Sequence, residues 1–264
     1  MREIPINSFA EYKERTESHK IREWIYRGHN NHNYKLESSL YRMFERNREI
    51  RYGKAKDKKT IALLRHEKVM LESFKRTSHM FFDSTLDKYS SLDLLALMQH
   101  YGAPTRMLDF SFSPYVALYF ALSGAHKEDA VVYCINHKKM KDELNKSQNK
   151  SKSFKILCNE KDESRINLKC YESKFINERL FAQQGVFLVP NTLIFSHEEI
   201  LDKCESTNFC LKLRIKTSCF SEIIKELYKM NITASTIFPG LEGFCKSFEN
   251  IGVLSIKSFH PLDD

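Results

Sequence analysis

A short stretch of the chain concentrates side chains that can hydrogen-bond or carry charge. Apolar, helix-like patterns flank it on both sides, at 92–98 and 114–122. Buried donors and acceptors must all find partners, so a plain connection would not need this density of polar groups beside a core. The stretch is predicted to form a ligand-binding or catalytic corner; the alternative is an Arg106–Asp109 pair that only pins a turn. Its polar members are Gln99, His100, Tyr101, Thr105, Arg106 and Asp109.

A second candidate is an arginine at the end of a predicted strand. Residues Glu23–Gly28 are rich in aromatic and β-branched types, and the glycine closes the run. The planar guanidinium of Arg27 suits a pyrophosphate or a carboxylate better than a lysine would. We expect Arg27 to point into a cleft where the backbone at Gly28 approaches a ligand closely. A purely structural bridge to a carboxylate is the alternative.

Two later segments carry further candidates. Gln183 and Gln184 come directly before a predicted strand, Val186–Val189, and their amides could read a base or the amide edge of nicotinamide, or else satisfy the backbone at the strand edge. Glu242 stands between two glycines. It is placed either to enter a cleft or to act as an acidic residue in the first turn of a helix, where it interacts favourably with the helix dipole.

Local signals define the elements that must position these residues. A helix is predicted from Ser90 or Ser91, as capping residue, to Gly102, and a second from Ser113-Pro114 to Gly124. Strands and helices follow no regular β-α-β rhythm, so the sequence predicts an α+β fold, with a mixed, largely antiparallel sheet and packed helices. The other expected elements are a helix over 60–76, strands over 130–135 and 209–216, and a helix over 221–230.

The net charge of +8 on 264 residues is unevenly distributed. Residues 42–59 hold eight lysines and arginines against three acids, and residues 136–155 hold seven against two. We interpret both as exposed, basic, loop-like insertions in a single domain spanning 1–264, and part of the second could also form a helix. They are either solvated loops or phosphate-tracking patches.

Composition and motif searches narrow the remaining classes. Seven cysteines without a C-x-x-C motif, and no apolar leader, favour a reduced, cytoplasmic protein. The longest apolar run, Tyr115–Leu122, is too short to span a membrane. His29 and His32 lack an evident partner ligand, so no metal is predicted. Dinucleotide G-x-G-x-x-G, P-loop, H-E-x-x-H and G-x-S-x-G motifs are absent.

The string MQHYGAPTRMLDFSFSPYVALYFA, residues 98–121, closely resembles the central motif of the FRG domain family. That family is named for a Phe/Tyr-Arg-Gly triplet, here Tyr26-Arg27-Gly28. The segments 181–187 (FAQQGVF) and 238–243 (FPGLEG) are similar to later family patches. Four patches in the family's order cover residues 22–250, nearly the whole chain. The long central motif is specific, whereas each of the others is weak alone.

The order of the family's motifs is in turn similar to that of ADP-ribosyltransferases. This resemblance implies an ADP-ribosyltransferase-like fold and an enzyme that uses NAD as substrate and an unknown nucleic acid or protein as acceptor. Under it, Arg27 holds pyrophosphate, the corner of His100, Thr105 and Arg106 holds ribose and phosphate, and Glu242 is the ribose carboxylate. It also implies a role in bacterial or phage conflict, as a defence protein or a toxin.

Two other functions stay open at this point. One is a nucleic-acid binder or nuclease, in which the two basic segments contact the phosphates of the nucleic acid. Its affinity for nucleic acid would then be sensitive to salt. Residues His100, Asp109 and Glu242 would then carry out hydrolysis. The other is a non-catalytic sensor, in which the polar corner binds a small ligand or a peptide.

Overall fold

The computed structural model describes residues 1–51, 56–82, 86, 88–124, 127–146, 166–174, 177–204, 206 and 208–250. Its centre is a seven-stranded sheet in the order β1-β7-β4-β2-β3-β6-β5. Only β1 and β7 pair in parallel; every other neighbouring pair in this sheet is antiparallel. The strands are β1 (Arg2–Ile6), β2 (Trp24–His29), β3 (Leu108–Ser111), β4 (Ala130–Asn136), β5 (Leu168–Tyr171), β6 (Gly185–Pro190) and β7 (Cys210–Ile215). The predicted α+β class with a mixed, largely antiparallel sheet is confirmed.

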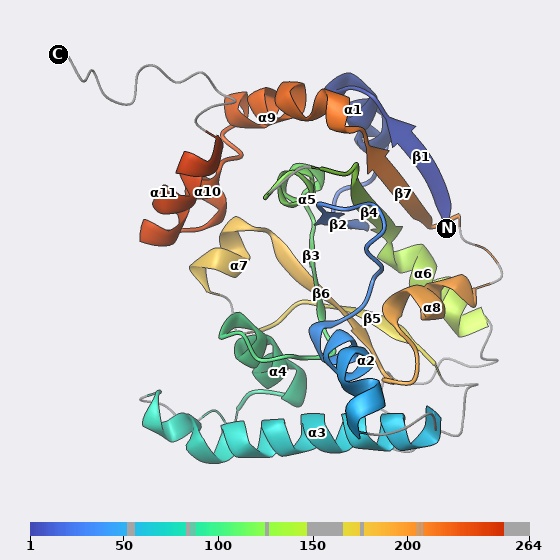
Figure 1. Cartoon of the computed structure of the whole chain (residues 1–264), viewed down its shortest axis with the longest axis vertical. Helices are drawn as coiled ribbons and strands as arrows, with labels where there is room; N and C mark the ends of the chain where they lie inside the picture. Colours follow the sequence, from blue (N-terminus) through green and yellow to red (C-terminus); the bar gives the residue numbers. More distant parts are fainter. Residues whose placement is uncertain are drawn as a thin grey trace.

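Helices cover both faces of the sheet. One apolar core joins β2, β4 and β7 to α1 (Phe9–Glu17), α5 (Pro114–Ala121), α9 (Phe220–Lys229) and α10 (Ala234–Ile237). The core on the other face includes α6 (His137–Lys146) and α8 (His197–Asp202). In Figure 1, α1 and α9 lie at one end of the molecule and α3 (Lys56–Thr77) runs along the other, beneath α2 (Ser39–Arg51) and α4 (Ser91–His100). Helices α7 (Glu178–Ala182) and α11 (Leu241–Ser247) lie at the side.

The two predicted helices around the polar stretch form as expected. Ser90 caps α4 in a complete capping box with Asp93, and Ser113 accepts from the backbone of Val116 ahead of a proline in the first turn of α5. Gly102 has a φ of 87°, which a glycine adopts without the steric cost that other residues meet. Local capping chemistry thus sets the length of the loop between these helices.

Gly28 lets α5 lie against β2 at close range. A Cβ on this residue would stand 2.0 Å from the carbonyl oxygen of Ala117 and 2.5 Å from the amide nitrogen of Ala121. Only glycine therefore permits this packing of helix on strand. The glycine thus lets one element approach another, and the expected close approach of a ligand to its backbone stays a prediction.

The basic segments differ from the loops that the sequence suggested. Residues 42–51 and 56–59 belong to α2 and α3, so the expectation of a loop-like insertion at 42–59 is wrong for the described part of it. Residues 137–146 form α6, which buries Met140 and Leu144 against the sheet. The remainder of the second segment, 147–155, lies outside the described residues.

Candidate functional site

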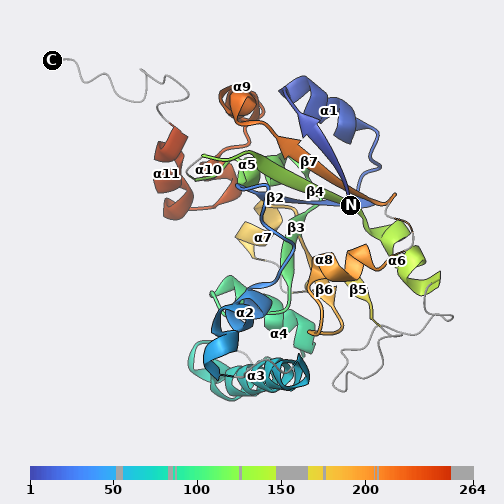
Figure 2. The same cartoon turned by 45° about the vertical axis from the view of Figure 1, so that its right-hand side comes forward.

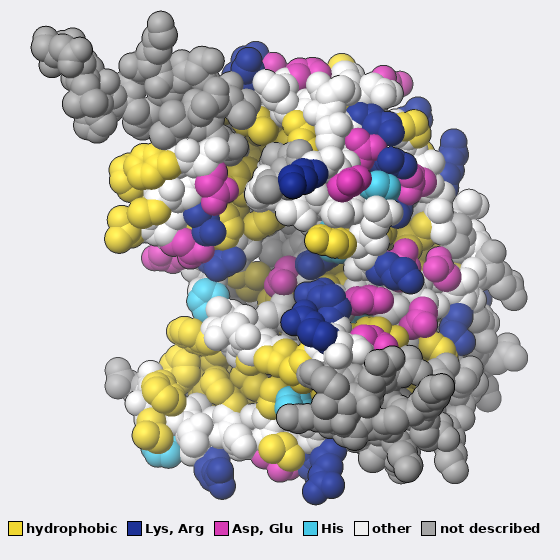
Figure 3. Space-filling view, in the orientation of Figure 1, with side chains coloured by type: hydrophobic (Ala, Val, Ile, Leu, Met, Phe, Trp, Pro, Cys, Tyr) yellow, Lys and Arg dark blue, Asp and Glu magenta, His cyan; other side chains and the backbone are white. Residues whose placement is uncertain are grey.

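Strands β2 and β3 separate almost as soon as they meet. Their only paired residues are Tyr26 and Ser111, after which β2 continues along β4 and β3 continues along β6. A cavity of about 660 Å³ opens beside this separation, between α4, α5 and α7. We call it the central cavity, and Figure 3 shows the molecule hollowed on this side. It is lined by residues of all five elements, among them Tyr26, Arg27, Gly28, His29, Gln99, His100, Asp109, Ser111, Phe120, Arg179 and Gln183.

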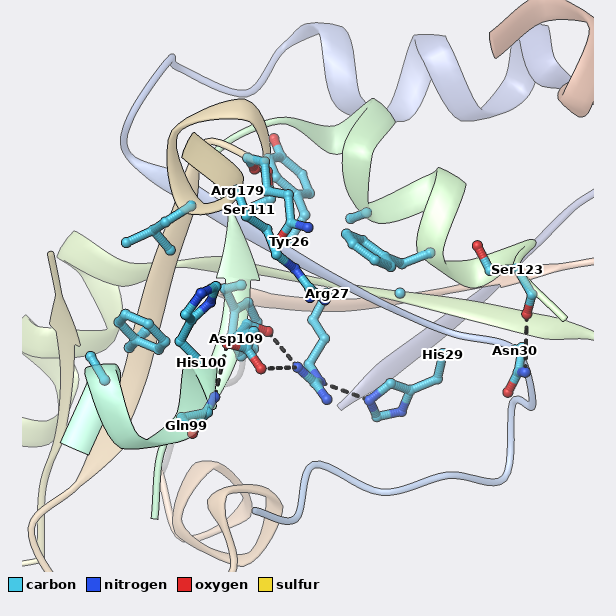
Figure 4. A pocket seen from close by; sticks show the side chains of 18 of the residues that line it. Tyr26, Arg27, His29, Asn30, Gln99, His100, Asp109, Ser111, Ser123 and Arg179 are labelled. Atoms are coloured by element: carbon cyan, nitrogen blue, oxygen red, sulfur yellow. Dashed lines mark hydrogen bonds and ion pairs between the residues drawn. The ribbon is translucent and has the colours of Figure 1, made fainter. Parts of the chain in front are cut away.

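Arg27 spans the separation between the two strands (Figure 4). Its Nη1 donates to the backbone oxygen of Asp109 at 2.5 Å and lies 4.0 Å from a carboxylate oxygen of the same residue. Its Nε donates to Nε2 of His29 at 2.8 Å. The Arg27 side chain is 19% exposed and that of Asp109 is 64% exposed, so a fixed cation stands beside an accessible carboxylate.

His29 is held as a neutral acceptor for Arg27. Its Nε2 accepts from the guanidinium, and its Nδ1 lies 3.3 Å from the backbone oxygen of Tyr34. Nδ1 therefore carries the proton and donates it to that carbonyl. Burial, followed by the charge of Arg27, lowers the pKa of His29 to about 3. Burial also lowers the pKa of Arg27 below its ordinary value, although the group remains a cation.

A chain of side-chain hydrogen bonds runs from the loop after α4 to Asp109. Thr105 Oγ1 donates to Oε1 of Gln99, and Nε2 of Gln99 donates to Asp109 Oδ1 at 2.8 Å. Thr105 is fully buried, and its hydroxyl also accepts from the backbone nitrogen of Met107. Gln99 is thus locked in one orientation, with its amide NH₂ toward the carboxylate.

Helix α7 forms the opposite wall of the cavity. Nε2 of Gln183 donates to the backbone oxygen of Ile237, and the backbone oxygen of Gln183 accepts from Ser111 Oγ at 2.7 Å. Arg179 lines the cavity, with its guanidinium 4.8 Å from the centre of the Phe238 ring. It lies 3.8 Å from a carboxylate oxygen of Glu242.

Most of the residues singled out in the sequence converge here. The central cavity brings together Tyr26, Arg27, Gly28, Gln99, His100, Asp109 and Gln183. Thr105 lies beneath it as the support of Gln99. Tyr101 is 68% exposed and does not line the cavity. Gln184 occupies a turn with a φ of 47°, where its carbonyl accepts from the backbone of Phe112.

Arg106 faces away from the site. Its side chain is fully buried, pairs with Glu67 of α3, and donates to the backbone oxygens of Pro190 and Asn191. The anticipated Arg106–Asp109 pair does not form, because the two side chains leave the backbone toward different neighbours. Arg106 ties α3 to the end of β6 and contributes no surface to the cavity.

Glu242 stands at the rim. It is in the first turn of α11, its side chain is 53% exposed, and it lies near Arg179 and Lys246. It is not part of the cavity lining. Of the two positions predicted for Glu242, the structure shows the one in the first turn of a helix, and the residue lies close to Arg179 of the cavity lining.

The lining residues that were not assigned to the site from sequence include His29 and Arg179. His29 follows Arg27 by two positions on one strand, and residues at that spacing share a face. That alternation was the available signal. The place of Arg179 in the cavity depends on how the short helix α7 packs against β6 and α10, which no local pattern reveals. Among the described residues, no cluster of three His, Cys, Asp or Glu side chains could hold a metal ion.

Comparisons with known proteins identify one domain. Residues 22–130 match the family model of the FRG domain, a range that contains β2, α4, β3 and α5. No curated protein and no solved structure matches the sequence. No helix within the described ranges is long and apolar enough to cross a bilayer. The matched range carries the Tyr26-Arg27-Gly28 triplet and the polar loop that meet in the central cavity, so the part of the chain that matches the FRG domain supplies much of the lining of this cavity.

Proposed function

We propose that the central cavity binds NAD and breaks the bond between nicotinamide and ribose, as an ADP-ribosyltransferase does. One observation carries this proposal: Arg27, fixed by His29, lies beside the accessible carboxylate of Asp109 in a cavity of about 660 Å³. That volume is within the range of pockets that enclose small organic ligands. A site for NAD needs a cation for the pyrophosphate and a carboxylate near the ribose, and Arg27 and Asp109 are groups of these two kinds.

The two arginines of the cavity suit a diphosphate. Arg27 comes from β2 and Arg179 from α7, and both line the cavity. Planar guanidinium groups bind phosphate oxygens through paired hydrogen bonds, which lysine cannot form. The Arg179 side chain is 42% exposed and contacts Glu242 at 3.8 Å and the Phe238 ring, so an anionic ligand can draw it inward. Gln183 and Gln99 supply amides for the remaining polar edges.

The chemistry requires stabilisation of a positive charge. When the C1′–N bond breaks, its electron pair leaves with nicotinamide, and the ribose gains oxocarbenium character that a nearby carboxylate stabilises. A nucleophilic oxygen or nitrogen of the acceptor then bonds to C1′ and loses its proton. We assign the stabilising role to Asp109, because it lines the cavity, and proton removal to His100. Glu242 becomes a rim residue that positions Arg179.

The activity is tested by nicotinamide release. Purified protein is mixed with NAD, alone and with cell lysate, DNA or RNA, and nicotinamide is separated by chromatography. Arg27→Lys keeps the charge and removes the fork, and we expect it to abolish release. Asp109→Asn should abolish release while Glu242→Gln only raises KM. Glu128→Gln, an exposed carboxylate away from the cavity, serves as the matched control.

The result also decides between the two carboxylates. If Glu242→Gln abolishes nicotinamide release while Asp109→Asn keeps full activity, the carboxylate that stabilises the ribose is Glu242 and not Asp109. No release with any acceptor, together with no NAD binding by calorimetry, overturns the proposal. Cleavage of DNA or RNA without NAD would favour the nuclease alternative. Because consumption of NAD harms a cell, expression of the wild type should slow bacterial growth and Arg27→Lys should relieve it, as the conflict role suggests.

A further inference from the structure

A second cavity lies on the side of the molecule that carries the N-terminal strand. It measures about 460 Å³ and shares no lining residue with the central cavity. Strand β1, helix α1 and helix α6 come together there, and Figure 2 turns this side forward. We call it the basic cavity. Its lining is Arg2, Ile4, Glu14, Arg15, Ser18, His19, Lys20, Glu23, Trp24, Asn136, Lys139 and Leu211.

The apolar part of the basic cavity is a stacked aromatic pair on the sheet. The ring of His19 lies 3.7 Å from that of Trp24 at an interplanar angle of 4°. Ile4 and Leu211, from the paired strands β1 and β7, complete this part of the lining. Burial lowers the pKa of His19 to about 4, so the imidazole is neutral at physiological pH. The stack is therefore an uncharged wall, and the charge of the cavity comes from other residues.

Four cations from separate elements converge on this wall. Arg2 lies on β1, Arg15 on α1, Lys20 in the turn before β2, and Lys139 on α6. Among the described residues, none lies within ion-pair distance of a carboxylate, although Lys20 is near enough to Glu23 to favour its charged form. Like charges gathered around one hollow repel each other, and a bound anion relieves that repulsion.

The two acids of the lining do not cancel this charge. Lys138, outside the lining, lies 3.2 Å from a carboxylate oxygen of Glu23 and, by its hydrogen bond, lowers the pKa of that group. Glu23 is thus neutralised by a cation that the cavity does not use. Glu14 is left against four cations. The excess of positive charge, with guanidinium groups from two different elements, favours phosphate over a carboxylate ligand.

We propose that the basic cavity binds the phosphate group of a small phosphorylated molecule, whose organic part packs against the Trp24–His19 stack. The site is separate from the proposed NAD site and does not depend on it. The two cavities are nevertheless linked, because Nδ1 of His19 is hydrogen-bonded to the hydroxyl of Tyr26 at 2.9 Å and Tyr26 lines the central cavity.

The intrinsic fluorescence of Trp24 can report ligand binding in the basic cavity, because Trp24 is the only tryptophan of the sequence. Ribose 5-phosphate is titrated at constant ionic strength while Trp24 fluorescence is followed, with ribose as the uncharged counterpart. We expect a saturable change with ribose 5-phosphate and none with ribose. An inorganic phosphate titration identifies the source of the group: tighter binding of the ester assigns the site to a phosphate ester, and equal binding assigns it to the free ion.

Matched variants locate the binding. The Arg2→Ala/Arg15→Ala pair should weaken the response about tenfold, because two charge-assisted contacts are lost. The Lys13→Ala/Lys225→Ala pair removes the same charge from exposed positions outside the lining and should leave it unchanged. Arg27→Lys should also leave it unchanged, which separates this site from the central cavity. If the melting curve of the Arg2→Ala/Arg15→Ala variant shows that it is unfolded, the Lys20→Ala/Lys139→Ala variant is used in its place.

Two results overturn the proposal. One is the absence of any saturable fluorescence change with ribose 5-phosphate or inorganic phosphate. The other is an equal loss of affinity in the lining pair and in the Lys13→Ala/Lys225→Ala pair, because that would mean that only the overall charge of the protein attracts the anion.

Discussion

The Nε of Arg27 donates a hydrogen bond of 2.8 Å to Nε2 of His29, two residues further along the same strand. The donor and the acceptor lie on one face of β2, so neither can turn without breaking the contact. A histidine that accepts from an arginine must keep its lone pair, which fixes both its charge and its tautomer. The orientation of the guanidinium therefore depends on a neutral imidazole.

This arrangement predicts how His29 titrates. Because burial and Arg27 lower its pKa to about 3, the imidazole should stay neutral, with the proton on Nδ1, from pH 8 down to about pH 4. Nitrogen-15 NMR of the histidine side chains measures this directly. His79, in the 3-10 turn Ser78–Met80, provides an exposed histidine for comparison. A His29 resonance that titrates near pH 6.5 would contradict the assignment.

The buried His197 should make the fold sensitive to acid. Its Nε2 lies 3.0 Å from the backbone oxygen of Leu188, and burial lowers its pKa to about 3. The unfolded chain binds a proton at this residue below about pH 6.5 and the folded chain does not, so stability falls as the pH drops from 6.5 toward 3. For this one group the slope is about 1.4 kcal/mol per pH unit.

His197→Gln tests this contribution, since its amide NH₂ can still donate to Leu188. Urea unfolding at pH 7 and at pH 5 should show a smaller difference in the variant than in the wild type. The same pH dependence in both proteins would show that other groups control acid unfolding.

Gly28→Ala should destabilise the protein through the packing of α5. The added Cβ meets Ala117 and Ala121 backbone atoms at 2.0 and 2.5 Å, and backbone cannot move aside as a flexible side chain can. We expect a loss of about 1–3 kcal/mol or more in the free energy of unfolding. Gly102→Ala is the comparison: it has open space but a positive φ, and should cost about 1–2 kcal/mol. Equal, small losses would rule out the close approach.

Arg106→Met separates a structural role from a ligand role. It leaves Glu67 buried without its partner, which should cost about 3–5 kcal/mol in unfolding free energy. The double variant with Glu67→Leu removes both charges and should recover much of that loss. Denaturant unfolding of the three proteins measures this. A stable single variant with weakened NAD binding would instead support the ligand role that the sequence suggested.

Signals contained within a few residues were read correctly from sequence. The caps at Ser90 and Ser113 set α4 and α5, and Arg27 lies on the strand that its neighbours predicted, although this strand continues past Gly28 to His29. The interpretation of Arg106 failed because this loop residue pairs with Glu67, 39 positions away in helix α3, which no local pattern reveals. The prediction of a loop over 42–59 was wrong for a related reason. Leu40 and Phe44 of α2 pack on Leu63 of α3, and this tertiary contact outweighs the polar composition of the segment.

The pairing of β1 with β7 also bears on when the protein can act during its synthesis. Arg2 pairs with Leu211, and α7 supplies Arg179 to a cavity whose other arginine is Arg27. During synthesis the N-terminal strands emerge from the ribosome before their partner strands have been made, and pairings between distant residues form late in folding. A nascent chain therefore holds no assembled site until most of its length has emerged, so an activity harmful to the cell would be withheld until synthesis of this region was complete.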